Sequence, residues 1–383
     1  MTAGKIPSTQ PYFSSRQRRL ILRSTLDILR TGRLILGPYT EKLERGFGGY
    51  IGSPYAVAVS SCTAAMEIVL RWIGVAGREV IVPTNTFVAS VNAVIFAGGR
   101  PVLADIDADS LCLSLRDTER KISRETKAVI LVHIAGIVHP RVESFRDLCR
   151  RRKIFLIEDV AHATGASIGA KSAKKAGGFG DAGCFSFYPT KVMTTGAGGM
   201  ITTRHRDLAE FAVSLRHHGA GRRGGLTDVQ RLGNDWLMDE FRAGVGLAQL
   251  ADIESMIAAR RRLAKSYSQA IRGMAAVKAM EPPKHIRHVY YKYPVVTPDP
   301  QIRRRLVDTL KSHYGIDTGS IYLPPVHRQP YHARALGLRP ENFPEAEDIL
   351  PRILCLPVYP QMTQKDQKRV LGALREVLSR LRR

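Results

Sequence analysis

The 383-residue sequence has few cysteines, few aromatic residues and no long apolar segment. Its five cysteines lie far apart and none has CxxC spacing, so the sequence indicates neither a zinc site nor a disulfide framework. No apolar run approaches the length that spans a bilayer, and the first twenty residues lack the apolar core of a secretory signal peptide. A cytoplasmic location is therefore the default expectation, with no membrane partner and no metal.

Acidic residues are also scarce, since 34 Asp and Glu oppose 58 Lys and Arg and leave a net charge of +24. Such a field favours anionic partners, and three interpretations stay open. They are a basic surface that only reflects the composition of the source proteome, an anionic small substrate such as a nucleotide-linked sugar, and nucleic acid. The basic residues are spread along the chain, and no RNA-recognition signature, zinc finger or single basic arm is present. We rank the three interpretations in that order.

The length suits two domains, one large and one smaller. In the first 200 residues, short apolar runs alternate with helical patterns, such as those at 63–72 and 86–96. Strands are predicted at 56–60, 80–82, 102–104, 128–133, 155–158, 183–187 and 200–203. Several of these are continuous runs of Val, Ile and Leu, which is typical of strands buried on both faces. The pattern predicts an α/β domain with a mostly parallel sheet.

The pattern changes after residue 239. Residues 240–271 predict one long helix, 289–296 a strand, and 363–381 an amphipathic helix. Its apolar face is formed by Val370, Leu371, Leu374, Val377, Leu378 and Leu381. Thr363 and Asp366 have the spacing of a capping box. We place the domain boundary near residue 250, which gives a large domain at 1–250, including an N-terminal arm, and a small domain at 251–383.

Two acidic residues, Glu158 and Asp159, end the apolar strand predicted at 155–158. Ligands in open α/β sheets bind beyond the carboxyl ends of the strands, so one of these acids is expected at the rim of a buried site. A buried carboxylate needs a cationic partner. A protonated pyridine nitrogen is such a partner, and the retained proton makes the ring a better electron sink. Taken alone, the segment fits a helix-capping Asp at least as well.

Lys191 follows the aromatic strand predicted at 183–187. A lysine at the end of a buried strand can be partly desolvated, which makes its amine nucleophilic and able to form a Schiff base with an aldehyde. Ser186, five positions earlier, offers a hydroxyl to a phosphate group. A surface lysine beside a structural serine is the alternative, and it is the commoner situation.

The segment at 59–65 runs from a strand into a helix, where free N–H groups and the helix dipole bind phosphate well. Thr63 adds a hydroxyl group there, although N-capping by Ser61 or Thr63 explains these residues equally. The glycine-rich segment at 194–199 would let the backbone turn tightly beside Lys191. It lacks the spacing of nucleotide-binding loops.

The order and spacing of these segments resemble the DegT/DnrJ/StrS aminotransferases, the sugar aminotransferase family within the fold-type I enzymes that use pyridoxal 5'-phosphate (PLP). The resemblance covers nearly the whole chain and is strongest in IEDVAHATGASIGAKSAKKAGGFGDAGCFSFYPTKVMTTGAGGMITT. It implies a large domain with a mostly parallel seven-stranded sheet and a smaller C-terminal α+β domain. It also implies a homodimer whose active sites are shared between subunits.

The resemblance further implies a role for each matched residue. Lys191 would hold the cofactor and shuttle a proton, while Asp159 would pair with the pyridinium nitrogen. The remaining cofactor-binding positions would be His162 near the phenolic oxygen, Phe87 on the ring face, and Thr63, the Ala64 backbone and Ser186 at the phosphate. The family's Asn that reaches the phosphate of the neighbouring subunit aligns with Asp235, and Asn234, one position earlier, could substitute for it. Tyr322, His327 and Arg328 lie in a segment that is near the sugar in the family.

The resemblance implies a transaminase that moves an amino group from glutamate, or glutamine, to a keto-sugar attached to a nucleoside diphosphate. Two alternatives stay open. One is a family member that makes a cyclitol or aminobenzoate-type amine, and the other is a regulatory homologue without catalysis. The sequence departs from the family pattern at Cys62, Val192, Ala197 and Asp235, which keeps the second alternative open. A further branch, the PLP-dependent sugar deoxygenation enzymes, carries His where this chain has Lys191.

Overall fold

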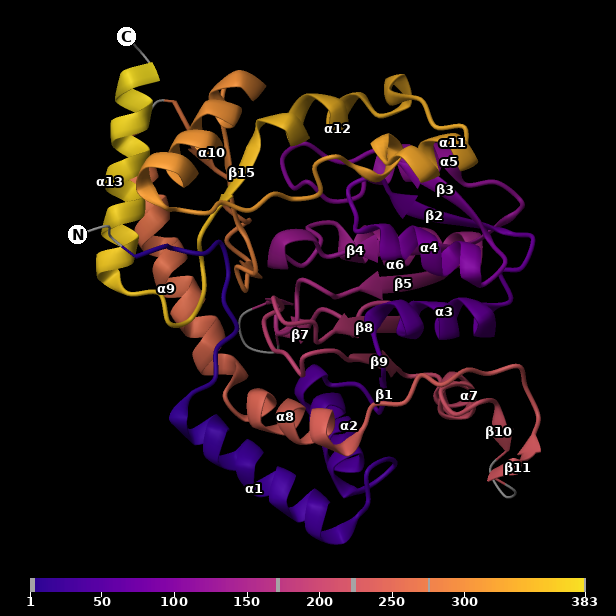
Figure 1. The fold of residues 1–383 in the computed structure, drawn as a ribbon. Coiled ribbons are helices and arrows are strands. Elements are labelled where there is room, and N and C mark those ends of the chain that lie inside the picture. Colours follow the sequence, from indigo (N-terminus) through magenta and orange to yellow (C-terminus); the bar gives the residue numbers. More distant parts are fainter. Residues whose placement is uncertain (1–3, 170–172, 222–224, 275, 382–383) are drawn as a thin grey trace.

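A seven-stranded sheet forms the centre of the computed structural model, which describes residues 4–169, 173–221, 225–274 and 276–381 (Figure 1). The strand order is β1-β9-β8-β5-β4-β2-β3. The strands are β1 (Tyr55–Val59), β2 (Glu79–Pro83), β3 (Arg100–Ala104), β4 (Thr126–Val132), β5 (Phe155–Asp159), β8 (Ala182–Ser186) and β9 (Gly199–Thr203). Each of the seven predicted strands overlaps one of these, so the α/β prediction is confirmed.

The sheet is mostly parallel, because β3, β2, β4, β5 and β8 run in one direction and only β9 runs against its neighbours β8 and β1. Parallel strands place their carboxyl ends at one edge of the sheet. Asp159 at the end of β5 therefore lies beside Cys184 in β8. This edge brings together residues that are far apart in the sequence.

Helices cover the sheet and fill the rest of the molecule (Figure 1). They are α1 (Ser15–Thr31), α2 (Pro38–Ile51), α3 (Cys62–Ile73), α4 (Val88–Phe96), α5 (Leu115–Lys121), α6 (Val142–Arg152), α7 (Arg206–Leu215), α8 (Glu240–Ala251), α9 (Ile253–Ile271), α10 (Pro300–Tyr314), α11 (Pro330–Ala335), α12 (Pro344–Ile349) and α13 (Gln364–Leu381). Short strands pair outside the main sheet: β10 (Ala220–Gly221) with β11 (Gly225–Val229); β13 (Ile286–Arg287), β6 (Ser167–Ile168) and β7 (Lys174–Lys175); and β12 (Lys278–Ala279), β14 (Tyr293–Val296) and β15 (Ile353–Leu356).

Two clusters of buried apolar side chains form the interior. The larger surrounds the seven-stranded sheet, and the smaller joins α9, α10, α13 and the β14–β15 pair. Five of the apolar side chains predicted on one face of the last helix, at 370, 371, 374, 377 and 378, are buried in the smaller cluster. At the start of this helix, the Asp366 N–H donates to the Thr363 hydroxyl at 3.1 Å and the Thr363 N–H donates to the Asp366 carboxylate at 3.2 Å, so the predicted capping box is present. The domain boundary near residue 250 stays a prediction.

The long helix predicted at 240–271 is two helices that meet at Asp252. This residue has non-helical dihedrals, φ −115° and ψ 9°. Its carboxylate accepts a hydrogen bond from the Ser14 hydroxyl at 3.0 Å and forms an ion pair with Arg16 at 2.8 Å. The Asp252 side chain is thus bound to the N-terminal arm at the point where its non-helical backbone separates the two helices.

The strand predicted at 289–296 is shorter than expected, because Tyr290 adopts a left-handed conformation with φ 51°. Only β14 joins a sheet. Before it, the N–H groups of Val289 and Lys292 donate to the carbonyls of Gly136 and Ala135, both at 3.0 Å. The chain is thereby turned so that Tyr291 and Lys292 approach the carboxyl edge of the large sheet.

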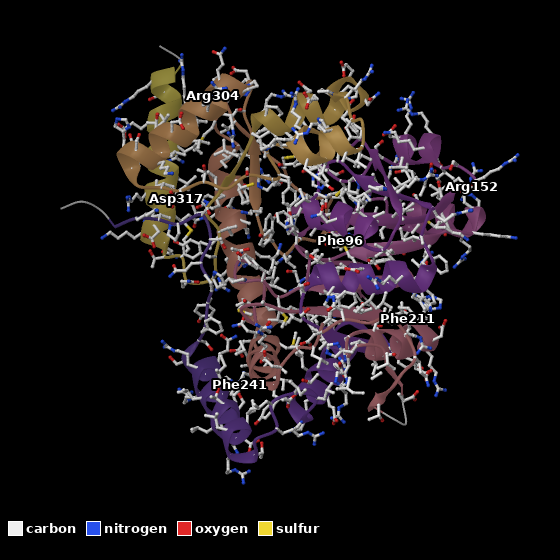
Figure 2. The ribbon with its side chains drawn as sticks, turned by 45° about the vertical axis from the view of Figure 1, so that its right-hand side comes forward. Phe96, Arg152, Phe211, Phe241, Arg304 and Asp317 are labelled. Carbon is white, nitrogen blue, oxygen red and sulfur yellow. The ribbon has the colours of Figure 1, made fainter. Side chains whose placement is uncertain are left out.

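The basic residues are distributed over the surface. Figure 2 shows Arg152 and Arg304 pointing outward from well-separated parts of the molecule. In the part of the chain that the structure describes, no helix has both the length and the apolar character needed to cross a bilayer.

Candidate active site

A cavity of about 470 Å³ opens at the carboxyl edge of the sheet. Its walls come from the ends of β5 and β8, the start of α3, the start of α4 and the C-terminal segment around residue 322. Of the residues predicted from the sequence, those that line this cavity are Thr63, Phe87, Asp159, His162, Ser186, Lys191 and Tyr322. Seven residues spread over 260 positions of sequence thus meet at one site.

The two acids that end β5 have different surroundings, because successive side chains of a strand point to opposite faces. Glu158 is fully buried and accepts hydrogen bonds from His133 Nε2 at 2.8 Å and from three backbone N–H groups at 2.6 to 2.8 Å. Those N–H groups belong to the segment at 177–180 that leads into β8. Glu158 therefore stabilises the fold, and Asp159 is the acid that faces the cavity.

Asp159 is a buried carboxylate with only neutral partners. Its two oxygens accept from the Ser90 hydroxyl at 2.8 Å and from the Ala161 N–H at 3.0 Å, and its exposed fraction is 5%. A carboxylate cannot donate, so Ser90 donates to Asp159, and the Thr86 hydroxyl, 2.8 Å away, in turn donates to Ser90. Among the described residues, no Lys, Arg or His forms an ion pair with Asp159. A cationic ring nitrogen is the partner that this carboxylate lacks, so the donor set fits a pyridinium ring.

Lys191 follows β8 after a turn in which its N–H donates to the Tyr188 carbonyl at 3.0 Å. Its Nζ lies 4.9 Å from the centre of the Tyr291 ring and faces the same cavity as Asp159. Among the described acidic residues, none forms an ion pair with this ammonium group. A half-buried amine without a carboxylate partner is suited to form a covalent bond with an aldehyde.

The start of α3 forms one wall of the cavity. The Ser61 side chain caps the helix by accepting the Ala64 N–H at 3.0 Å. Ala64 itself does not line the cavity, so the structure assigns its N–H to the cap and not to the phosphate contact implied by the resemblance. The N–H groups of the first two helical residues, Cys62 and Thr63, have no partner within a helix, and they remain for an anion beside the hydroxyls of Thr63 and Ser186.

Gly199 makes this helix start possible. A Cβ atom on Gly199 would lie 2.4 Å from the carbonyl carbon of Ser61 and 2.7 Å from the Cys62 nitrogen. Only a residue without a side chain lets β9 pass this close to the turn. The departure from the family pattern at Cys62 is accommodated by burial of the thiol, which raises its pKa well above the ordinary value.

His162 contacts two tyrosine rings: its centroid lies 4.3 Å from that of Tyr291, with the ring planes tilted by 32°, and 5.6 Å from that of Tyr322, on which it stacks. Burial and the nearby cations of Lys191 and Lys292 hold the pKa of His162 well below its usual range, so the ring is neutral. Its Nδ1 accepts the Ala135 N–H at 3.3 Å, so Nε2 carries the proton and donates to the Tyr322 hydroxyl oxygen at 2.8 Å. The Tyr322 O–H is therefore not used by His162 and can donate to a group bound in the cavity.

Three of the predicted residues lie away from the cavity. His327 is buried, stacks on Phe343 at 4.4 Å and forms hydrogen bonds with Thr84 and with Glu347. Arg328 is half exposed and forms an ion pair with the same Glu347. Asn234 is exposed, and its side chain accepts the N–H of the next residue at 2.8 Å. The geometry of a single subunit therefore gives none of the three a contact with the cavity.

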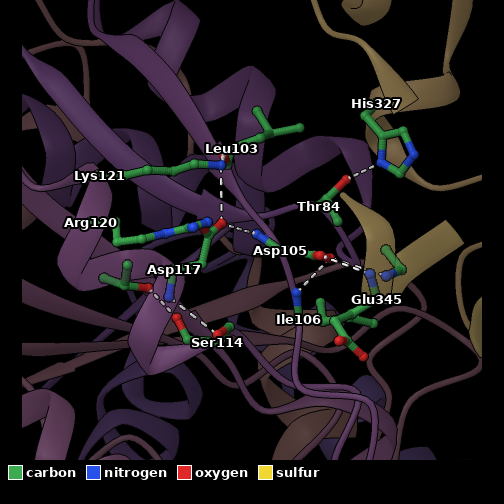
Figure 3. Close-up of polar contacts among 12 residues, drawn as sticks. Thr84, Leu103, Asp105, Ile106, Ser114, Asp117, Arg120, Lys121, His327 and Glu345 are labelled. Atoms are coloured by element: carbon green, nitrogen blue, oxygen red, sulfur yellow. Dashed lines mark hydrogen bonds and ion pairs between the residues drawn. The ribbon is translucent and has the colours of Figure 1, made fainter. Parts of the chain in front are cut away.

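His327 instead belongs to the contacts that dock the C-terminal segment on the large sheet (Figure 3). Its Nδ1 meets the Thr84 hydroxyl at 2.5 Å. Nearby, the Asp105 carboxylate accepts the backbone N–H groups of Glu345 and Ala346 at 2.9 and 3.1 Å, at the start of α12. These contacts fix the segment at 320–350, which carries Tyr322 into the cavity.

Sequence reasoning missed Ser90, Tyr291 and Lys292. Ser90 lies inside a predicted helix and has no motif of its own, so only its 2.8 Å contact with Asp159 identifies it. Tyr291 lines the cavity from 100 positions beyond Lys191, and it appeared to be part of a strand. Among the described residues, no group of three or more His, Cys, Asp or Glu side chains is placed to hold a metal ion.

Comparison with known proteins places this geometry in a family. GDP-perosamine synthase of Escherichia coli O157:H7 is 32% identical over 377 residues, which cover 98% of this chain and 99% of that protein. The aminotransferase TlmJ from Streptoalloteichus hindustanus superposes with a TM-score of 0.90 at 28% identity, over 99% and 100% of the two chains. NtdA from Bacillus subtilis, solved with bound cofactor PMP, superposes with a TM-score of 0.87 at 27% identity, over 99% and 87%.

The family model for the DegT/DnrJ/EryC1/StrS aminotransferases matches residues 16–375. The match includes every wall of the cavity, from Thr63 to Tyr322. The cavity, with its unpaired lysine and its buried carboxylate, has the groups that a pyridoxal cofactor needs, in agreement with the cofactor-bound relative. This chain belongs to the DegT/DnrJ/EryC1/StrS aminotransferase family.

Proposed function

We propose that this chain is a PLP-dependent transaminase that takes an amino group from glutamate, or glutamine, and transfers it to the keto group of a nucleotide-linked sugar. The observation that carries the proposal is the convergence of Lys191 and Asp159 on one cavity beside the phosphate-type start of α3. GDP-perosamine synthase, a relative at 32% identity, supports a sugar nucleotide as the acceptor. The +24 net charge suits the phosphates of such a molecule.

The proposal gives a task to the residues that would hold the cofactor. When bound, PLP supplies a ring that withdraws electrons from the substrate carbon. Lys191 holds the cofactor through Nζ, and the same amine, once released, moves the proton at the reacting carbon. Asp159 keeps the ring nitrogen protonated, and Ser90 holds that carboxylate in place. Thr63, Ser186 and the amides of the first turn of α3 bind the phosphate.

The proposal includes a homodimer. Leu22, Leu26 and Leu29 of α1 lie on one helix face and have exposed fractions of 64%, 68% and 62%. An apolar helix face of this kind is more stable when another surface covers it. Asn234, which is outside the cavity of its own subunit, could then contact the phosphate of the partner. Sedimentation of the wild type and of Leu26→Glu tests this part, since loss of the dimer is expected only in the variant.

Visible absorption tests the central claim. The purified protein with added PLP should be yellow, and addition of glutamate should bleach the absorption of the lysine-linked cofactor. Lys191→Ala should lose the lysine-linked band, whereas Lys265→Ala, a substitution on the exposed face of α9, should keep it. A wild-type protein that remains colourless with PLP would refute the proposal. A yellow protein that responds to no amino donor would favour the regulatory alternative.

A further inference from the structure

A second chamber of about 380 Å³ adjoins the cofactor cavity. The two share four lining residues, Phe87, His162, Tyr291 and Tyr322, so the outer chamber leads to the reacting end of Lys191. The C-terminal segment forms its other wall, through Ser320 and Gln329. A molecule that reacts at Lys191 would place its remaining atoms here.

Lys292 is the one cationic side chain among the described residues that line the outer chamber, and no carboxylate lines it. The side chain is half-buried and, among the described residues, has no ion-pair partner. His162 adds no charge, because burial and the neighbouring lysines hold its pKa well below the usual range. An ammonium group that is partly removed from water and lacks an anion is the one unsatisfied charge of this chamber.

Three contacts position Lys292, one through its backbone and two around its ammonium group. The backbone N–H of Lys292 donates to the Ala135 carbonyl at 3.0 Å. Its Nζ lies 5.4 Å from the centre of the Tyr291 ring, which also has the Nζ of Lys191 at 4.9 Å. A Cβ atom on Gly319 would lie 2.9 Å from the Lys292 Nζ, so the glycine leaves the space that the lysine occupies.

The positive charges of Lys191 and Lys292 lower the pKa of the neighbouring Tyr291. Burial by itself raises the pKa of Tyr291, but the cations of Lys191 and Lys292 and a hydrogen bond with Thr190 outweigh burial and lower it. The entrance to the reacting lysine is thus electropositive. An anionic group is attracted to this place, whereas a neutral one gains little.

We propose that the Lys292 ammonium group binds an oxyanion of the reacting molecule in the outer chamber, which is either a carboxylate of the amino donor or a phosphate of the acceptor. This inference rests on the proposed transaminase function and adds the residue that selects anionic substrates. In the proposed transaminase, donor and acceptor would react in turn at the same cavity beside Lys191, so both would meet the same ammonium group. Loss of one charge-assisted contact is expected to weaken binding about 10- to 100-fold.

The test uses four PLP-loaded proteins: the wild type and the variants Lys292→Gln, Lys292→Arg and Lys265→Gln. Lys265→Gln removes the same charge from the exposed face of α9. The concentration of L-glutamate that half-saturates the spectral change measures the affinity for the amino donor. Calorimetry with inorganic pyrophosphate measures the affinity for a phosphate group. Cofactor absorption in the three variants that matches the wild type shows that the cofactor cavity is intact.

We expect Lys292→Gln to weaken the binding of glutamate, of pyrophosphate or of both about 10- to 100-fold. Lys292→Arg should retain most of this binding. An effect on glutamate alone assigns Lys292 to the donor carboxylate, and an effect on pyrophosphate alone assigns it to the acceptor. Values for Lys292→Gln that match those of Lys265→Gln with both probes overturn the inference. A wild type that responds to no amino donor refutes the proposed function instead, and pyrophosphate still reports on Lys292.

Discussion

Ser90→Ala removes the side-chain hydrogen bond that holds the Asp159 carboxylate in the cavity. The Ser90 hydroxyl is 1% exposed and donates to Asp159 at 2.8 Å, while Thr86 donates to Ser90 at the same distance. Alanine removes a hydrogen bond to a charged acceptor, which contributes about 1.5–3 kcal/mol, and leaves the buried Thr86 hydroxyl without its acceptor, at about 1 kcal/mol more. The free energy of unfolding should therefore fall by about 2.5–4 kcal/mol.

Urea denaturation measures the change in the free energy of unfolding, and PLP titration measures the change in cofactor affinity. Thr86→Val removes only the neutral hydrogen bond, so it should lower the free energy of unfolding by about 0.5–1.5 kcal/mol and leave PLP affinity near the wild-type value. Ser90→Ala should weaken PLP binding about tenfold, equivalent to about 1.4 kcal/mol, because the Asp159 carboxylate loses its fixed orientation. Ser379→Ala, at an exposed position of α13, is the control. Wild-type PLP affinity in Ser90→Ala, or equal effects of Ser90→Ala and Thr86→Val, would refute the reasoning.

Three further predictions concern the surroundings of the cavity. Glu158→Gln replaces one carboxylate oxygen, which accepts two hydrogen bonds, with an amide NH2 group, so two buried donors lose their acceptor. The free energy of unfolding, measured by urea denaturation, should fall by about 2–5 kcal/mol. A decrease below about 1 kcal/mol would contradict the assigned role. Gly199→Ala forces a Cβ atom to 2.4 Å from Ser61, so PLP titration should show weaker binding than in Gly273→Ala, where nothing lies within 4 Å. The Arg328 ion pair, opposed by burial and helped by His327, lowers the pKa of Glu347 from 4.5 to about 2. Because the folded pKa is the lower one, the stabilisation is present above pH 4.5 and is lost as the pH falls toward 2. The free energy of unfolding should therefore fall less over this pH range in Glu347→Gln than in the wild type. Equal losses in the two proteins, measured by urea denaturation, would disprove the prediction.

Much of the large domain could be predicted from the sequence, because its strands are buried on both faces and their apolar runs leave a strong local signal. All seven strands of the sheet were found in this way. The predictions failed where local pattern and tertiary contact disagree. Asp252 interrupts a helical pattern because Ser14 and Arg16 bind its carboxylate, and Tyr290 shortens a strand by adopting a left-handed conformation.

The candidate site was predictable in part. Lys191, Asp159, Ser186 and Thr63 follow strands of the sheet, and the rule that ligands bind at carboxyl ends brought them together before the structure was known. The strand pattern alone did not distinguish Glu158 from Asp159, since strand facing depends on what each side of the sheet packs against. The structure places the Asp159 side chain at the cavity, in agreement with what the family resemblance implied. It also placed His327 near the substrate, whereas the structure uses its ring against Thr84 and Phe343.

The sequence by itself determined the class of fold and the family, and it singled out Lys191, because these depend on residues that are close in the chain or fixed in spacing. Tertiary structure alone decided what surrounds that lysine. Ser90 reaches Asp159 across 69 positions, and Tyr291 and Lys292 come to the cavity only because a left-handed turn docks them on Ala135 and Gly136. Contacts between distant segments leave no periodic pattern in a sequence, so only the tertiary structure shows which groups surround Lys191 and Asp159.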